Sequence, residues 1–179
     1  MATNFPTSFD TFTNPSTGSA LNSPSHAGQH ADINDAMEAV QAKLGLTSGW
    51  TAFTPSWNNF TIGDGTDQWY YCAINEMLFI TGRSVWGSTT TQTGALQMEI
   101  PYGTSIMNVA QPVGSANYLE NGSGTNYVGL ITTQSTTTLG FREFNVSGSL
   151  VSQANVFASS PFTWGANDQI RATMTLRLT

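Results

Sequence analysis

A two-residue alternation of apolar and polar side chains constrains this chain most, and it recurs from Trp50 to the C-terminus. In "IRATMTLRLT" one set of alternate positions is apolar, and the other set holds Thr and Arg. Successive side chains of a β-strand point to opposite faces, so this pattern predicts a half-buried strand. Similar patterns occur in "DQWYYCAI", "EMLFITGRSVW", "TNYVGLITT" and "TTLGFREF".

Turn-forming segments separate these predicted strands. "GDGTD", "GSTTTQTG", "ENGSG" and "GAND" are rich in residues that favour turns. Many short strands with no helical pattern between them indicate an antiparallel sandwich. We therefore predict a mainly β fold whose C-terminal domain is a jelly-roll-like β-sandwich, large enough for about eight strands.

A helical period occurs in "SPSHAGQHADINDAMEAVQAKLG", which also contains both histidines. Ser23 followed by Pro24 favours a helix start, and Asp32 with Asp35 offers an alternative start. Gly45 favours the end of the helix. The sequence therefore predicts one short helix before the sandwich.

Apolar residues of this helix are separated by four, three and four positions, the alternation of a coiled-coil seam. The predicted oligomerisation seam comprises His30, Ile33, Met37, Val40 and Leu44. A seam of about two to three heptads is too short to be stable alone, because helix nucleation is costly. It needs a partner, either the sheet of its own chain or copies of the same helix.

The N-terminal segment contains many Thr, Ser, Asn and Pro residues and has no regular period. Its apolar anchors are Phe5, Phe9 and Phe12. A segment of this composition does not form a packed core by itself. We predict three parts: an extended docking arm at residues 1–22, an oligomerisation helix at 23–45 and the sandwich at 46–179.

Charge and composition limit the partners and compartment. The formal net charge is -6, and five Lys plus Arg residues form no basic stripe, so we expect no nucleic-acid partner. The single cysteine, Cys72, excludes an intrachain disulfide and a thiolate metal cage, and we expect it to be a small buried hydrophobe. We also expect no secretory signal and no membrane insertion, because neither a basic n-region nor a long apolar run occurs.

Two groups of residues have the spacing of metal ligands. His26 and His30 lie four residues apart on one helix face, with Asp32 nearby, but a glutamate that could act as a general base is missing between them. Hydrogen bonding at a helix start or an interface explains both histidines more simply. Asp64 and Asp67 in "GDGTD" lack the spacing of a calcium loop, and a hairpin turn explains them.

The sequence contains no recognisable set of catalytic residues. The remaining acids considered are scattered among different predicted strands: Glu76, Glu99, Glu120, Glu143 and Asp168. Two histidines confined to the helix complete no set of nucleophile, base and orienting group. We therefore predict that the protein is not an enzyme and uses no cofactor.

Aromatic residues offer a different route to function, because exposed indole faces stack on sugars and other flat ligands. The chain has five tryptophans, most of which we expect in the core. Trp69 and Tyr71 share one face of a predicted strand and Tyr70 lies on the other face. At least one of these three side chains should therefore be exposed.

The segments "NFPTSFDTFTNP" and "SPSHAGQHADINDAMEAVQAKLG" resemble an N-terminal module of bacteriophage virion proteins, found in fibres and other appendages. The resemblance covers about residues 4–45 and implies a segment that docks on the particle and trimerises. "FTPSWNNFTIGDGT", "INEMLFITGRSVWGSTT" and "FTWGANDQIRATMTLRLT" look like the distal β-sandwich of such proteins. This second likeness bears on fold more than on function.

The resemblance and the seam together lead us to expect a short homotrimeric fibre or appendage, made in the host cytoplasm and located in the virion. Its arm would contact other virion proteins of the tail, neck or capsid. A capsid decoration (cement) protein and a polysaccharide-degrading tail enzyme stay open as alternatives. If the sandwich meets a host-surface glycan, loops are the expected site. The candidate loop residues are Thr89, Thr90, Thr91, Asn121, Ser123, Thr136 and Thr137.

Overall fold

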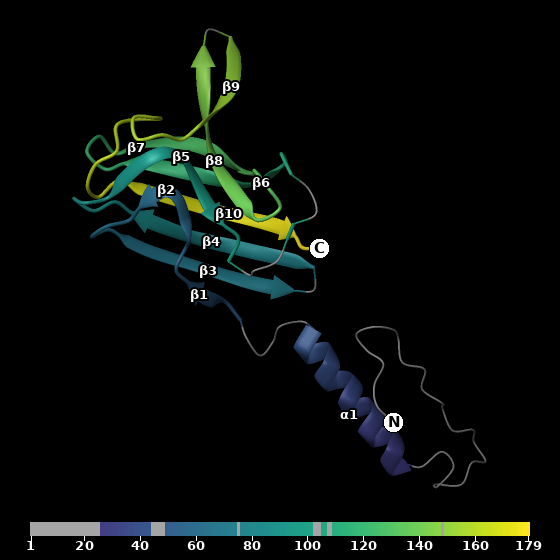
Figure 1. Cartoon of the computed structure of the whole chain (residues 1–179). Helices are drawn as coiled ribbons and strands as arrows, with labels where there is room; N and C mark the ends of the chain where they lie inside the picture. The colour runs from purple at the N-terminus through teal and green to yellow at the C-terminus, as the bar shows by residue number, and fades with distance from the viewer. Residues whose placement is uncertain (1–25, 44–48, 75, 102–104, 107–108, 148) are drawn as a thin grey trace. The chain divides into compact units, whose positions relative to one another are not determined.

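The computed structural model describes residues 26–43, 49–74, 76–101, 105–106, 109–147 and 149–179 (Figure 1). The chain divides into two units, Met1–Gly49 and Trp50–Thr179. The described part of the first unit is one helix, α1 (His26–Lys43), so the predicted helix is present. Several predicted features lie outside the described residues: the ends of the helix, Leu44 of the seam, and the arm with Phe5, Phe9 and Phe12.

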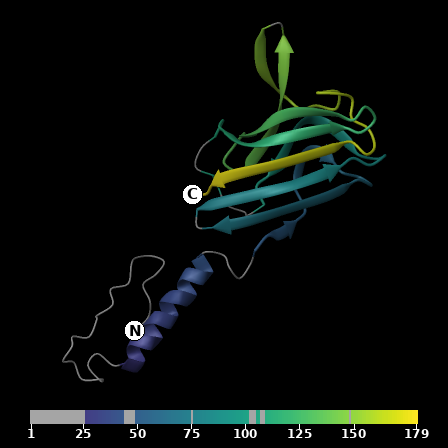
Figure 2. The same ribbon diagram turned by 180° about the vertical axis from the view of Figure 1, so that it is seen from behind.

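The described part of the second unit is built from antiparallel strands (Figures 1 and 2). They are β1 (Thr51–Phe53), β2 (Trp57–Thr61), β3 (Thr66–Ile74), β4 (Met77–Val85), β5 (Thr91–Glu99), β6 (Pro112–Glu120), β7 (Thr125–Thr133), β8 (Thr138–Ser147), β9 (Leu150–Asn155) and β10 (Gln169–Arg177). The prediction of a mainly β, antiparallel, jelly-roll-like fold with one short helix is confirmed. The strands exceed the eight expected, because short strands occur at both ends of the pairing path.

The strands form one continuous ladder in the order β1-β3-β4-β10-β6-β7-β8-β5-β2, with β9 paired to β8 outside this path. Neighbours in sequence pair as hairpins at β3–β4, β6–β7, β7–β8 and β8–β9. The last strand, β10, lies between β4 and β6. The centre of the sheet therefore depends on pairing between segments that are far apart in the chain.

The sheet curls so that strands near its two ends face each other. The ring centroids of Trp57 on β2 and Trp69 on β3 are 5.8 Å apart, although six strands lie between β2 and β3 in the pairing order. Phe141 on β8 lies 5.6 Å from Trp57 and 6.5 Å from Trp69. These rings fill the space between the two halves of the curled sheet, which gives the unit its sandwich character.

The two-residue alternation decides which side chains enter the core. The apolar positions of β10 are buried, as is Leu178 directly after the strand: Ile170, Ala172, Met174, Leu176 and Leu178. On β3, Trp69 is 1% exposed and Tyr70 is 43% exposed, as the alternation predicted. Cys72 is only partly buried, because it shares the outer face with Tyr70.

A polar network crosses this core. The indole nitrogen of Trp69 donates to the hydroxyl of Ser84 at 2.9 Å, and that hydroxyl donates to Asp67. Gly82 lies directly opposite Trp69, and a Cβ at Gly82 would lie 2.4 Å from the indole ring. Because Gly82 has no side chain, the indole of Trp69 has space to pack against it and to reach the hydroxyl of Ser84.

Candidate functional site

The predicted seam forms an exposed apolar line along α1. Its described apolar members are Ile33, Met37 and Val40, which are 54%, 56% and 37% exposed. His30, one turn earlier, is also exposed. A short helix with an uncovered apolar side gains most of its stability from packing that side against something else. The seam is therefore a candidate contact surface.

The side chain of His26, which the histidine metal hypothesis requires, lies outside the described residues. Within the described residues, His, Cys, Asp and Glu side chains form no group of three or more that could hold a metal ion. The "GDGTD" segment forms a turn in which the Gly65 amide donates to the carbonyl of Ile62 at 2.9 Å. This geometry favours the hairpin-turn interpretation.

The first predicted receptor loop is shorter than expected and uses its polar groups internally. Thr91 was placed in this loop, but it begins β5. Asp64 accepts hydrogen bonds from the backbone amide and hydroxyl of Thr89, both at 2.8 Å, and from the hydroxyl of Ser88. The hydroxyl of Thr90 donates to the carbonyl of Ile62. The loop is therefore closed onto the neighbouring turn.

Hydrogen bonding also explains the acidity of Asp64. The backbone amide of Thr89, followed by the hydroxyls of Ser88 and Thr89, stabilises the charged carboxylate and lowers its pKa far below the ordinary value of 3.8. The carboxylate is fully exposed. Asp64 therefore stabilises the loop through these hydrogen bonds.

The other predicted receptor loops lie at opposite ends of β7. Asn121 and Ser123 belong to the turn before β7, and Thr136 and Thr137 follow its last residue. The Asn121 turn is at the same end of the sheet as the Thr89 loop, because Val85, Gln169 and Leu119 are neighbours in register. The named loops therefore do not form one face: Thr136 and Thr137 are at the other end.

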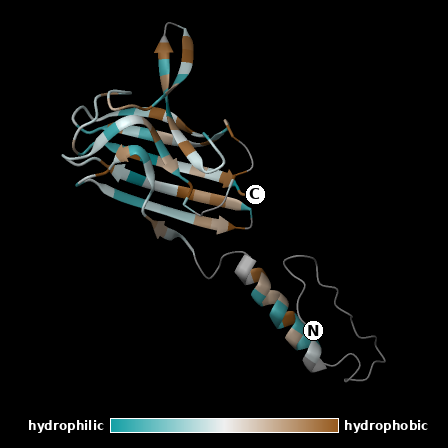
Figure 3. Cartoon of the chain, viewed as in Figure 1, coloured by the Kyte–Doolittle hydropathy of each residue, from teal (hydrophilic) through white to brown (hydrophobic). Residues whose placement is uncertain are grey.

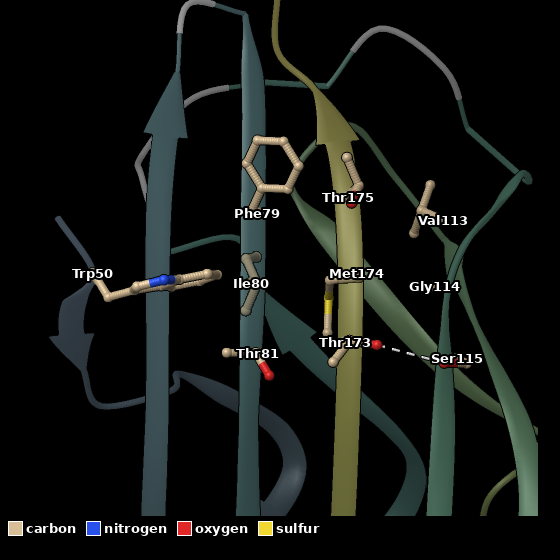
Figure 4. Close-up of a pocket in the computed structure, with 10 residues that line it drawn as sticks. All are labelled: Trp50, Phe79, Ile80, Thr81, Val113, Gly114, Ser115, Thr173, Met174 and Thr175. Atoms are coloured by element: carbon tan, nitrogen blue, oxygen red, sulfur yellow. Dashed lines mark hydrogen bonds between the residues drawn. The ribbon is translucent and has the colours of Figure 1, made fainter. Parts of the chain in front are cut away.

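A shallow trough lies on the outer face of β4, β10 and β6, away from the core (Figure 4). Two adjoining grooves of about 440 Å³ and 370 Å³ form it, and both are lined by Thr81, Ser115 and Thr173. Thr173 is the direct neighbour of Thr81 on one side and of Ser115 on the other. We call these three side chains the hydroxyl row and the combined groove the outer trough.

One end of the outer trough is aromatic. Trp50 is 55% exposed and lines the larger groove together with Phe79, Val113 and Thr175. Figure 4 shows the indole of Trp50 extending toward Phe79 and Thr81 of β4. Its flat face is therefore available at the end of a groove.

The other end of the outer trough is cationic. Arg171 lines the smaller groove together with Asn117 and Val128, and Arg83 lies directly opposite Arg171 on β4. Each guanidinium is held by a glutamine: Arg83 donates to Gln68 at 3.1 and 2.7 Å, and Arg171 donates to Gln169 at 3.1 and 2.8 Å. Among the described residues, no carboxylate forms an ion pair with either arginine. On this sheet, Arg177 instead forms an ion pair with Glu76 at 3.2 Å.

The carboxylates singled out from the sequence have local partners. Glu76 pairs with Arg177, Glu99 accepts from Asn58, Glu120 accepts from Ser123, Glu143 accepts from Ser160, and Asp168 accepts from the backbone amides of Asn121 and Gly165. Glu143 is 1% exposed and Asp168 is 5% exposed. Four of these acids belong to strand ends and loop closures, whereas Glu143 lies within β8 and its second carboxylate oxygen is buried without a hydrogen-bond partner.

A projecting two-stranded ribbon is a further apolar surface. Beyond Glu143 the described pairings of β8 are to β9, so this hairpin extends away from the sheet (Figure 1). Phe144, Val146 and Val151 lie on one face of it and are 39%, 73% and 65% exposed, with Leu150 at the tip (Figure 3). Two-stranded ribbons are marginal alone, and exposed apolar strands tend to associate. This ribbon is therefore a second candidate contact surface.

Comparisons with protein-family models, with curated proteins and with solved structures give no match for this chain. In the described part of the chain, no helix is both long enough and apolar enough to cross a bilayer. Function is therefore inferred from the seam, the ribbon and the outer trough. The alternation showed which residues face outward on each strand, but the trough and the ribbon depend on which strands are neighbours.

Proposed function

We propose that the protein is a bacteriophage virion structural protein, a short homotrimeric appendage docked on the particle by its N-terminus. The observation that carries the proposal is the exposed line of Ile33, Met37 and Val40 on α1. A closed ring of three chains buries this side of every helix, and the spacing is that of a coiled coil. In this proposal the protein is not an enzyme and needs no cofactor.

The phage assignment is supported by the resemblance of about residues 4–45 to the N-terminal module of virion appendage proteins. The arm at 1–22 docks on another virion protein, of the tail, neck or capsid, through Phe5, Phe9 and Phe12. Aromatic anchors that lack a core of their own are suited to pockets on a partner. The sandwich then projects from the particle and meets the host surface.

The decisive first experiment is a mass measurement of the purified chain in solution. We expect three copies at micromolar concentration, and a stable monomer there would contradict the trimer. Immunogold imaging of the protein on phage particles then tests its location. Labelling spread over the capsid shell would support a decoration protein, whereas labelling at the tail or neck supports an appendage.

The enzymatic alternative has its own readout. Purified protein would be incubated with host capsule or wall polysaccharide, and reducing ends would be measured. We expect no release above a heat-denatured control. Sustained release of reducing sugar would replace the structural proposal with that of a tail depolymerase.

A further inference from the structure

We propose that the outer trough binds an acidic oligosaccharide, with Arg171 and Arg83 at its carboxylate and the indole of Trp50 against a sugar ring. This inference rests on the proposed function in one respect, that the sandwich faces the host surface. It assigns the ligand contact to a sheet face and not to the loops named from the sequence.

Charge is the first argument. Arg83 and Arg171 are direct cross-strand neighbours, and like charges in that position repel each other. Gln68 and Gln169 orient the two guanidinium groups, but a neutral amide does not cancel their charge. The chain has five Lys plus Arg residues and a net charge of -6, so this pair is a local concentration of its scarce positive charge. A carboxylate bound here relieves the repulsion and accepts paired hydrogen bonds from a guanidinium.

The hydroxyl row is the second argument. Thr81, Thr173 and Ser115 line both grooves, and the Ser115 and Thr173 oxygens lie 3.5 Å apart (Figure 4). Each hydroxyl can donate and accept, which matches the hydroxyls of a sugar. Because the side chains of the hydroxyl row are short, they do not fill the outer trough. The middle of the trough is therefore suited to the polar edge of a saccharide.

The aromatic end is the third argument. Trp50 is 55% exposed at the rim of the larger groove, beside Phe79 and Val113. An exposed indole offers a flat apolar face on which a sugar ring can stack. At the rise of a β-strand, Thr175 and Arg171 mark positions about 14 Å apart along β10. That distance fits a short oligosaccharide rather than a single sugar.

The same observations favour a saccharide over a second copy of the chain. A symmetric contact in which the cationic ends of two outer troughs face each other would bring four arginines together, and Glu76 on this sheet is already paired with Arg177. An acidic peptide would neutralise Arg83 and Arg171, and its backbone could form hydrogen bonds with the hydroxyl row. A peptide such as tetraglutamate, however, has no ring that could stack on the indole of Trp50. The test therefore includes an acidic peptide as a separate arm.

The experiment is isothermal titration of the purified full-length protein with defined probes. The acidic probes are tetragalacturonate, a sialylated trisaccharide and a chondroitin tetrasaccharide. The matched neutral probe is fully methyl-esterified tetragalacturonate, and the peptide probe is tetraglutamate. We expect at least one acidic saccharide to bind, with weakening as salt is added, and the methyl ester to bind about tenfold more weakly or not at all.

Variants locate the site. Arg171→Gln should weaken binding of the acidic saccharide about tenfold, because a charge-assisted contact is lost. Trp50→Ala should weaken binding without changing its salt dependence. The matched control is Arg177→Gln, which removes a cation from the same strand and face but outside both grooves. It should change affinity less than about twofold.

Three results would overturn the inference. One is absence of binding by every acidic saccharide at millimolar concentration, and another is equal loss of affinity in Arg171→Gln and Arg177→Gln. The third is binding of tetraglutamate at least as tight as that of any saccharide, which would assign the trough to an acidic protein surface. These outcomes are separate from the proposed function, since imaging and mass measurements do not involve the trough.

Discussion

The indole nitrogen of Trp57 donates a 3.1 Å hydrogen bond to Asp67, which joins β2 to β3 across the curled sheet. The second oxygen of the same carboxylate accepts from Ser84. Asp67 therefore connects strands that do not pair with each other. It also serves donors that have little access to water, so its removal has a predictable cost.

Replacing Asp67 with alanine should destabilise the sandwich. Trp57 and Ser84 would each lose an acceptor, and an unsatisfied buried donor costs about 1–3 kcal/mol. Urea unfolding followed by tryptophan fluorescence would measure the change in the free energy of unfolding. Trp57→Phe, which keeps the ring but removes one donor, should cost less. A cost below about 0.5 kcal/mol for Asp67→Ala would show that this connection is not needed.

Charges placed in the seam should dissociate the trimer. Met37→Asp combined with Val40→Asp would bury carboxylates without partners between the helices. Light scattering should then report the mass of a single chain, with an unchanged β-sheet spectrum. Ala31→Asp combined with Ala39→Asp adds the same charge to the same helix outside the seam and should leave the trimer intact. A trimer that survives the seam substitutions would place the oligomer contact elsewhere.

Acid should weaken the loop closure made by Asp64. Its pKa is lowered in the folded chain by the Thr89 amide and the neighbouring hydroxyls. A lowered folded-state pKa contributes stability that is present above the ordinary value of 3.8 and is lost as the pH falls toward the lowered value. Unfolding of the native protein and of Asp64→Asn, compared at several pH values, should show the largest difference at neutral pH. A difference independent of pH would exclude the charge as its cause.

Deletion of residues 1–22 should abolish virion attachment and leave the sandwich folded. The arm has no periodic pattern, so it adds little to a core formed from Trp50 onward. Thermal unfolding of the truncated chain would test folding, and its recovery with purified particles would test attachment. Ser substitution of Phe5, Phe9 and Phe12 is the matched full-length variant. Normal incorporation of either variant would refute the docking role.

Much of this fold was predictable because its signals are local. The alternation in Gln169–Arg177 correctly assigned the buried and exposed sides of that strand, and the spacing from Ile33 to Val40 correctly indicated a helix. Exposure of Tyr70 beside buried Trp69 followed from the same two-residue period. Each of these depends on a few neighbouring residues.

The outer trough depends on pairing between distant segments. Arg83 and Arg171 are neighbours only because β10 pairs with β4, which no local pattern specifies. The Thr and Ser content of the predicted receptor loops makes them candidates for glycan binding, but composition does not show that the Thr89 amide and hydroxyl already donate hydrogen bonds to Asp64. It also could not show that Thr136 lies at the opposite end of β7 from Asn121. The register of strand pairing, and not the amino-acid composition, determines which residues are neighbours in the folded sheet.

The position of β10 between β4 and β6 has a consequence for synthesis. The ribosome makes this strand after the other described strands of the sheet, yet the earlier strands on either side need it to complete the sheet. Until Gln169–Arg177 emerges, β4 and β6 each lack a neighbour on one side, and open strand edges of this kind are prone to join other chains. Closure of the sandwich therefore waits for β10, and a nascent chain stalled before Gln169 is an aggregation hazard rather than a shorter functional protein.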